Sequence, residues 1–150
     1  MCSTISKTAQ IAPTATILDG VIIGENVVIG DGVWIDRGCI IRDNVRIGNN
    51  SRIGARCILG EYLQDFYREL HNGEHPLVIG ENALIRSETI IYGDTTIGPW
   101  CKVGGELNNV VMHSYSNKAH DGFLGNAVIG QWCNIGGGCS ASNLKNDYTE

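Results

Sequence analysis

Long hydrophobic runs are missing from this 150-residue chain, and so is a surplus of basic side chains. No apolar stretch approaches the ~20 residues that a membrane-spanning helix needs, and the N-terminus lacks the basic and apolar regions of a signal peptide. The 11 Lys and Arg residues stand against 16 Asp and Glu residues, and the resulting net charge of −5 argues against a nucleic-acid binder. We therefore expect a cytoplasmic protein that contacts neither membrane nor nucleic acid.

Cysteine pairs with a metal-binding or redox spacing are missing too. The chain has 6 cysteines, but none form a CxxC pair or a zinc-like pattern. Scattered cysteines in a chain without an export signal are more often reduced core thiols than disulfides. The sequence thus predicts reduced, buried cysteines and no metal requirement.

An aliphatic side chain at every sixth position dominates what is present. The series reads Ile5, Ile11, Ile17, Ile23, Ile29, Ile35, Ile41, Ile47, Ile53 and Leu59, then Ile79, Ile85, Ile91, Ile97 and Val103, and finally Phe123, Ile129 and Ile135. Glycine often follows the aliphatic residue. This period is neither the 3.6 of a helix nor the alternation of an ordinary strand, and a fixed internal period indicates a repeat architecture.

A six-residue period predicts one short strand and one bend for each repeat. Three such sides close a triangular coil of about eighteen residues, and successive coils pair as parallel strands about 4.8 Å apart. The aliphatic residue points inward, and the bends need residues that tolerate positive φ. Such residues occur at that phase as Glu25-Asn26, Asp31-Gly32, Asp43-Asn44 and Asn49-Asn50. Residues 1–150 are therefore expected to form a single all-β domain, a parallel β-helix.

The first interruption of the period covers residues 60–77. Within it Leu63, Phe66, Tyr67 and Leu70 follow a helical spacing, and Asn72-Gly73 supplies a stop signal. We expect a short amphipathic helix that leaves the coil and folds back over its side. His71 and His75 lie here, either as solvated loop residues or as part of a functional loop.

The second interruption contains the stretch SNKAHDGFLG, residues 116–125. Counting from Val103, the spacing predicts two extra residues at Gly104-Gly105 and inward positions at Val111, Asn117 and Phe123. His120 would then project outward from the middle of one side. On these grounds Asn117 and His120 are candidates for a ligand site, with Phe123 in the core.

Residues 98–150 resemble a known family through N-x-x-H-x-x-F-L-G from Asn117, VIGQWCNIGGG from Val128 and SNLK from Ser142. Similar motifs occur in the acetyltransferase half of bifunctional sugar-1-phosphate nucleotidyltransferase/glucosamine-1-phosphate acetyltransferases. The whole repeat resembles the hexapeptide-repeat transferases, which implies a left-handed β-helix. By this resemblance His120 is the general base that takes a proton from the sugar amine.

The same resemblance implies the other site residues. Asn134 and Asn143 match amide residues that hold the sugar phosphate or the acyl group, and Lys145 matches a phosphate-binding residue. Phe123 stands where the family commonly has tyrosine, beside Asn117. Backbone amides at Gly136, Gly137 and Gly138 are expected to face the developing oxyanion.

Residues 1–97 resemble a different branch, the stand-alone nucleotide-sugar N-acetyltransferases of surface-polysaccharide synthesis. The excursion and the segment from Val78 to Gly98 carry this similarity. We therefore expect a composite join near residue 98, and a β-helix whose C-terminal coils are fewer than in the family.

Two functions follow from the resemblance. The first is an N-acetyltransferase that uses acetyl-CoA as co-substrate, needs no metal and acts on an amino-sugar phosphate or a nucleotide-linked amino sugar. The second is a non-catalytic trimerising or regulatory module of a sugar-1-phosphate nucleotidyltransferase. A third, weaker alternative is a carbonic-anhydrase-like protein with zinc held by three of His71, His75, His113 and His120. In every case the resemblance implies a homotrimer, with active sites between subunits.

Overall fold

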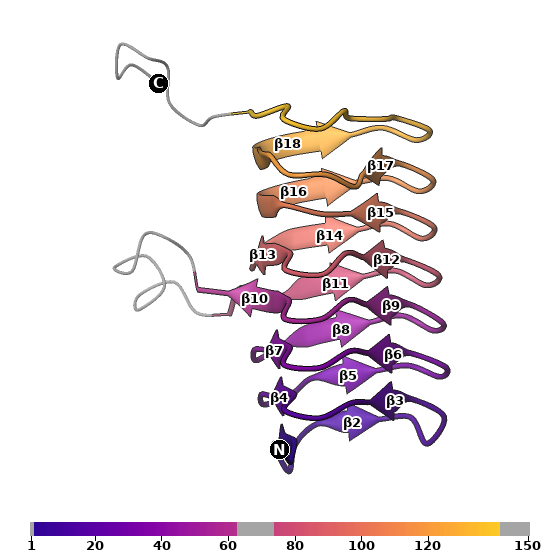
Figure 1. The fold of residues 1–150 in the computed structure, drawn as a ribbon, viewed down its shortest axis with the longest axis vertical. Coiled ribbons are helices and arrows are strands. Elements are labelled where there is room, and N and C mark those ends of the chain that lie inside the picture. Colours follow the sequence, from indigo (N-terminus) through magenta and orange to yellow (C-terminus); the bar gives the residue numbers. More distant parts are fainter. Residues whose placement is uncertain (1, 63–73, 142–150) are drawn as a thin grey trace.

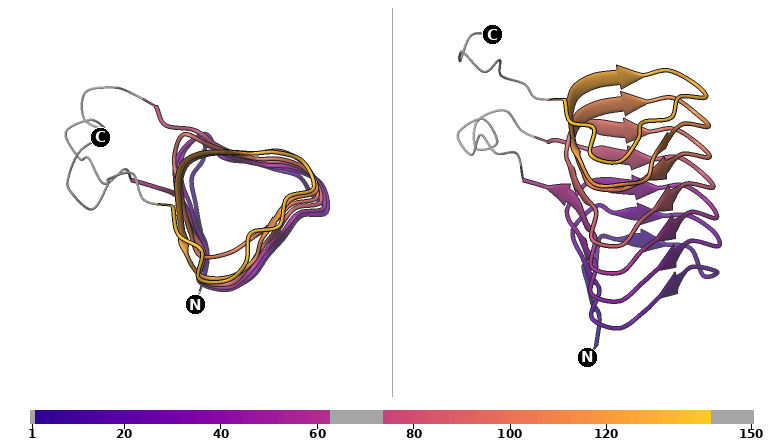
Figure 2. Two further views of the ribbon diagram at one scale, coloured as in Figure 1. Left: turned by 90° about the horizontal axis from the view of Figure 1, so that it is seen from above. Right: turned by 45° about the horizontal axis from the view of Figure 1, so that its top comes forward.

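The structure is a computed structural model that describes residues 2–62 and 74–141. In these ranges the chain contains only short parallel strands, arranged in one sheet of 12 strands and one of 6. Figure 1 shows the strands stacked into a column, and the view along the column shows coils with a triangular outline (Figure 2). The predicted left-handed parallel β-helix is confirmed.

Each side of the triangle is a parallel stack. The first face consists of β1 (Thr4–Ile5), β4 (Ile22–Ile23), β7 (Ile40–Ile41), β10 (Ile58–Glu61) and β13 (Ile90–Tyr92). The second face consists of β2 (Gln10–Ile11), β5 (Val28–Ile29), β8 (Val45–Ile47), β11 (Leu77–Ile79) and β14 (Thr95–Ile97). The third face consists of β3 (Thr16–Ile17), β6 (Trp34–Ile35), β9 (Arg52–Ile53), β12 (Leu84–Ile85), β15 (Lys102–Val103) and β17 (Asn117–Lys118). Two longer strands, β16 (Glu106–Met112) and β18 (Phe123–Ile129), continue from the first face into the second.

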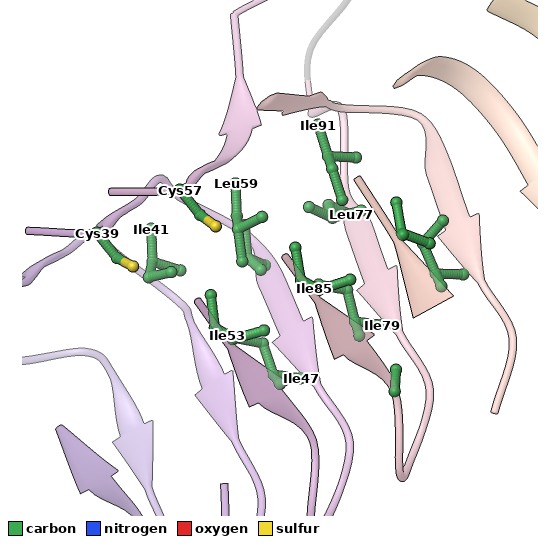
Figure 3. Packing of buried hydrophobic residues seen from close by; sticks show 14 of the residues in the cluster. Cys39, Ile41, Ile47, Ile53, Cys57, Leu59, Leu77, Ile79, Ile85 and Ile91 are labelled. Atoms are coloured by element: carbon green, nitrogen blue, oxygen red, sulfur yellow. The ribbon is translucent and has the colours of Figure 1, made fainter. Parts of the chain in front are cut away.

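The six-residue series fills the interior of the column. Ile5 pairs with Ile23, and Ile41 pairs with Leu59, so that one coil takes 18 residues. The inward side chains stack in three columns, which include Ile41, Leu59 and Ile91, then Ile47 and Ile79, then Ile53 and Ile85 (Figure 3). Full burial of one such side chain is worth about 1.5–3 kcal/mol. The repeated aliphatic residue therefore supplies most of the driving force for stacking the coils.

The first excursion leaves the coil between β10 and β11 without disturbing the register. Ile79 pairs with Ile47, so this one coil takes 32 residues where others take 18. The helix expected from Leu63 to Leu70 lies outside the described residues, as does His71. His75 lies at the return of the chain, where its Nδ1 is 2.8 Å from Oδ2 of Asp94. Its side chain is only 12% exposed, so the interpretation of His75 as a solvated residue is wrong.

The predicted inward positions Val111, Asn117 and Phe123 are also wrong, whereas Ile129 and Ile135 pack against the core as predicted. The corner from the third face to the first has five residues between Ile85 and Ile91 but only three between Val103 and Leu107. The coil is thus two residues shorter at the double glycine, and the next step, from Leu107 to Met112, takes five residues where Ile91 to Ile97 takes six. In consequence the inward positions shift to Leu107, Met112, Lys118 and Leu124, whereas Val111 is 41% exposed and Asn117 and Phe123 are half-buried.

The bends occur where the sequence predicts them. Asn26, Asn44, Asn50 and Gly32 all have left-handed backbone, with φ between 55° and 66°. Further along the chain this conformation is adopted by large aromatic residues, with φ of 61° at Trp100, 62° at Tyr115 and 59° at Trp132. The rings of Tyr115 and Trp132 stack with centroids 4.5 Å apart. Coil-on-coil stacking therefore imposes the bend even on residues that disfavour it.

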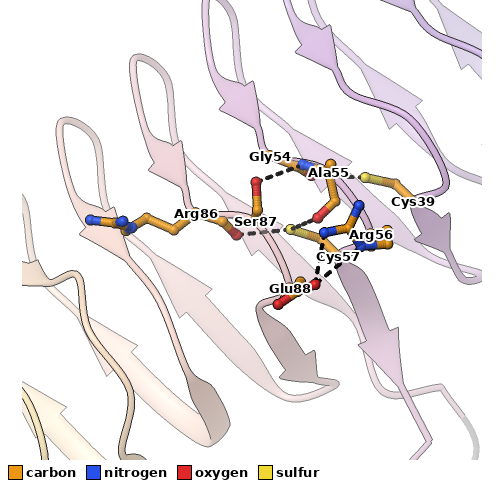
Figure 4. Close-up of polar contacts among 8 residues, drawn as sticks. All are labelled: Cys39, Gly54, Ala55, Arg56, Cys57, Arg86, Ser87 and Glu88. Atoms are coloured by element: carbon orange, nitrogen blue, oxygen red, sulfur yellow. Dashed lines mark hydrogen bonds and ion pairs between the residues drawn. The ribbon is translucent and has the colours of Figure 1, made fainter.

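The six free cysteines divide into two groups. Cys39, Cys57 and Cys101 are buried, whereas Cys2, Cys133 and Cys139 are exposed, so the prediction of buried thiols holds for half of them. The Cys39 thiol donates to the carbonyl of Gly54 and that of Cys57 to the carbonyl of Arg86, each at 3.0 Å (Figure 4). The neighbouring Cys39 and burial raise the pKa of Cys57, and burial raises the pKa of Cys101.

We predict that a thiol reagent at pH 8 will label Cys2, Cys133 and Cys139 quickly in the native protein. The three remaining cysteines should react only on unfolding, because burial blocks access to all of them, and the raised pKa values of Cys57 and Cys101 also disfavour their thiolates. Mass spectrometry of alkylated peptides identifies each site, and labelling in guanidinium provides the six-thiol reference. Rapid native labelling of Cys39 or Cys57 would contradict the inward column of the first coils.

Candidate functional site

A cleft of about 440 Å³ opens at the corner between the third face and the first. It is lined by Arg86 and Ser87 from one coil, Gly104 and Gly105 from the next, Ala119, His120 and Asp121 from the third, and Gly137 and Gly138 from the last. Four successive coils therefore contribute to it. Of the candidates from the sequence, the cleft brings together His120, Gly137 and Gly138.

The cleft exists because the corner at Gly104-Gly105 is short. Coils on either side have longer corners, so the two glycines lie back from the surface and form the floor. A Cβ at Gly104 would collide with the carbonyl of Ala119. Gly105 has φ of +80°, and a Cβ there would lie 2.8 Å from the carbonyl oxygen of Gly122. Neither position has room for a side chain, which explains why both residues are glycine.

His120 is exposed at the rim of the cleft, two residues after the end of β17. Gly137 lies over it in the next coil, where a Cβ would be 3.2 Å from Cβ of His120. The Gly138 amide donates to the carbonyl of Asp121 at 2.9 Å. The missing side chains at these glycines leave the imidazole accessible from the cleft.

Arg86 is a site residue that sequence reasoning missed. Its backbone carbonyl accepts from the Cys57 thiol, whereas its guanidinium extends away from the labelled polar residues (Figure 4). Within residues 2–62 and 74–141 this guanidinium forms no ion pair, in contrast to Arg56 one coil below, which is 2.7 Å from Glu88. The sequence does contain a signal for Arg86, because it precedes Gly104 by 18 positions and should therefore lie directly below it in the neighbouring coil. Arg86 thus offers an unpaired cation to an anionic ligand.

Lys118 is the second residue that sequence reasoning missed. It occupies the inward position above Val103 and is 1% exposed. Its Nζ donates to the carbonyl of Gly104 at 3.0 Å and to that of His120 at 2.9 Å. Burial lowers the pKa of Lys118, and the carboxylate of Asp121 partly opposes this effect.

The remaining candidates lie beside the cleft or outside the description. Asn117 forms a parallel backbone bridge with Asn134 of the next coil on the third face, so the two residues are neighbours in adjacent coils. The Oδ1 atom of Asn117 is buried and has no hydrogen-bond partner. Phe123 pairs with Glu106 on the first face and does not line the cleft. Asn143 and Lys145 fall outside the described residues.

The other two histidines in the described part of the chain do not join this site. His75 pairs with Asp94, and His113 is exposed after β16. No group of three or more His, Cys, Asp or Glu side chains that could hold a metal ion is found among the described residues. Nor does any helix in the described part of the chain have the length and hydropathy to cross a bilayer.

Comparison with known proteins supports the transferase resemblance. A family model described as bacterial transferase hexapeptide (six repeats) matches residues 26–61, and none of the curated proteins matches the chain. UDP-N-acetylglucosamine O-acyltransferase (LpxA) from Moraxella catarrhalis is similar in structure, with a TM-score of 0.56 and 25% identity over 89% of this chain. A hexapeptide transferase family protein from Anaplasma phagocytophilum has a TM-score of 0.50 and 17% identity, covering 92% of this chain and 72% of its own. This chain spans 60% of the length of the Moraxella enzyme.

We predict that Gly105→Ala will destabilise the protein by about 1–3 kcal/mol more than Gly138→Ala does. Both glycines have φ close to +80°, so the backbone strain is matched. An added Cβ meets Gly122 and Lys118 only at Gly105, and nothing lies within 4 Å at Gly138. Urea denaturation followed by circular dichroism measures the difference. Equal midpoints for the two variants would contradict the close approach of coils at the cleft floor.

Proposed function

We propose that this hexapeptide-repeat β-helix is an acyltransferase that moves the acetyl group of acetyl-CoA to the amine of an amino sugar linked to phosphate or nucleotide. The observation that carries this proposal is the cleft, whose lining includes the exposed residue His120 and, two coils below it, the unpaired guanidinium of Arg86. A base and an anion-binding group are the two functions that this reaction needs. Similarity to an acyltransferase named for a UDP-sugar substrate supports the same class of reaction.

In the proposed reaction His120 accepts a proton from the amine as its nitrogen attacks the thioester carbonyl carbon. The C–N bond forms, the C–S bond breaks, and coenzyme A leaves as its thiol after taking the proton. Arg86 binds a phosphate of the sugar substrate. Because Gly138 already donates its amide to Asp121, the oxyanion role rests on the amides of Gly136 and Gly137.

Asn117 and Asn134 keep the substrate-binding roles that the resemblance assigns to them. Of the two, the exposed Asn134 would make the direct hydrogen bond to a polar group of the substrate, because the Oδ1 atom of Asn117 is buried. Asn143 and Lys145 keep the roles that the resemblance assigns to them, in the acyl or phosphate subsite. The resemblance assigns Phe123 to the sugar subsite as well, although this residue does not line the cleft. A cytoplasmic homotrimer remains the expected form, which light scattering of the purified chain tests.

We predict that acetyl-CoA binds saturably in calorimetry and that His120→Ala lowers turnover about 10²- to 10⁴-fold. His113→Ala is the matched control, because this exposed histidine lies outside the cleft. Chromatography with mass detection of the acetylated sugar is preferable to thiol dyes, since three exposed cysteines would react with them.

The acceptors to compare are glucosamine 1-phosphate, a UDP-linked amino sugar and UDP-N-acetylglucosamine. Transfer only to a hydroxyl of the last would overturn N-acetylation and keep the acyltransferase class. Absence of binding at millimolar acetyl-CoA, in a sample shown to be trimeric, would favour the non-catalytic module.

We predict that Arg86→Ala raises the KM for the phosphorylated acceptor roughly tenfold or more and leaves the KM for acetyl-CoA nearly unchanged. The reason is the loss of one charge-assisted hydrogen bond to phosphate. Arg56→Ala is the control, because that exposed arginine lies one coil lower and is already paired with Glu88. Equal effects of the two substitutions on the acceptor KM would remove Arg86 from the phosphate subsite.

A further inference from the structure

A lysine occupies a position that is aliphatic elsewhere in its column. On the third face Lys118 stacks on Val103, which stacks on Ile85 and Ile53 below it. Lysine is almost never buried without a partner, because removing the ammonium from water is costly. Here the side chain is 1% exposed. A buried ammonium needs hydrogen-bond acceptors to replace water, and the identity of these acceptors shows which parts of the chain it connects.

Both acceptors are backbone atoms of the cleft. Nζ of Lys118 lies 3.0 Å from the carbonyl oxygen of Gly104 and 2.9 Å from that of His120. Gly104 belongs to the cleft floor, and His120 belongs to the rim in the coil above. One ammonium therefore ties two successive coils together at the site. A Cβ at Gly105 would lie 2.9 Å from Nζ, so this glycine provides the space that the ammonium fills.

The imidazole itself has no other support among the described residues. A histidine that acts as a base is usually oriented by a third group hydrogen-bonded to its ring. In the described part of the chain no side-chain hydrogen bond reaches the His120 ring, and Gly137 lies close enough that an added Cβ there would be 3.6 Å from the ring atom Cγ. The direction of the imidazole is thus set by its own backbone.

We propose that Lys118 is a positioning residue whose buried ammonium clamps the backbone of His120 to the cleft floor and so directs the imidazole into the cleft. The catalytic consequence rests on the proposed acyltransferase function. The mechanical part, a clamp between Gly104 and His120, does not. The two parts are therefore tested separately.

The mechanical test compares Lys118→Met, which keeps the length and removes the cation, with Ile85→Met in the same column. We expect the amide ¹⁵N order parameter of His120 to fall from the rigid range of about 0.85 toward 0.6 in Lys118→Met. Ile85→Met should leave it unchanged. Unchanged order parameters in both variants would overturn the clamp, whether or not the protein has enzymatic activity.

The catalytic test uses the same two variants. Misplacement of a base by about 1 Å can cost 10²-fold in rate, so Lys118→Met should lower kcat roughly 10- to 100-fold with KM within about threefold. A matching loss in Ile85→Met would mean that core disruption alone explains the effect. If wild type has no activity, the proposed function fails and the order parameters alone decide the clamp.

The pH dependence of stability provides a further check on the cation. Because burial lowers the pKa of Lys118, the unfolded chain binds more protons between the folded pKa and about 10.5. Wild type should gain stability relative to Lys118→Met as pH rises through this window. The charged or titratable groups that act on Nζ are Asp121 and Cys139, which are present in both proteins. Parallel curves for the two proteins would contradict a desolvated ammonium.

If Lys118→Met does not fold, the clamp can still be tested by NMR on the wild-type protein. With ¹⁵N-labelled lysine, a hydrogen-bonded ammonium gives a slowly exchanging Nζ cross-peak at neutral pH. An NOE from that signal to the amide of Gly105 assigns it to Lys118. Fast exchange of every lysine ammonium would overturn the clamp.

Discussion

Everything in this molecule depends on the register with which each coil pairs with the coil below it. Parallel backbone hydrogen bonds at each face hold equivalent residues 18 apart in contact, as between Ile23 and Ile41. This 18-residue spacing stacks similar side chains on one another, so each inward aliphatic residue is buried by the equivalent residue of the next coil. The core of the described coils consists of these stacked side chains, and a shift in register would therefore also expose them.

The candidate cleft lies where the coils keep this register although one corner contains two residues fewer than in the coil below. Between Val103 and Leu107 the chain turns the corner two residues early, and glycines at 104 and 105 allow the coil above to approach closely. The shortened corner creates both the hollow and a set of inward-facing carbonyls. A buried ammonium satisfies two of them, which explains why an aliphatic column contains Lys118. The hollow follows from this short corner, and the inward phase of Lys118 also requires the step from Leu107 to Met112, which is one residue shorter than in the coil below.

The residues of the candidate site come from several successive coils. Arg86, His120 and Gly137 are far apart in sequence but lie on one corner, because each is carried there by the same coil phase. A rigid column can therefore combine a cation, a base and backbone amides without long loops. The proposed acyl transfer uses this arrangement, with phosphate at the coil of Arg86 and the reacting amine two coils above it.

The amino-acid sequence by itself determined the fold, the coil length and the bends, because each depends on a local pattern that repeats. The inward series up to Val103 and the positive φ at Asn26, Asn44 and Asn50 follow from that pattern and are confirmed. The sequence also singled out His120 and the glycines at 137 and 138 through a family resemblance, and these three do meet in the cleft. Only the tertiary structure decided the phase between Val103 and Leu124, since the inward positions of Ile129 and Ile135 agree with the sequence period. Val110, Val111 and Met112 are all apolar, so periodicity could not choose between inward and outward residues. The choice depends on two shortened steps, the corner at Gly104-Gly105 and the step from Leu107 to Met112, and both are set by pairing with residues about one coil apart. The roles of Arg86 and Lys118 depend on the same pairing, and no local sequence pattern records it.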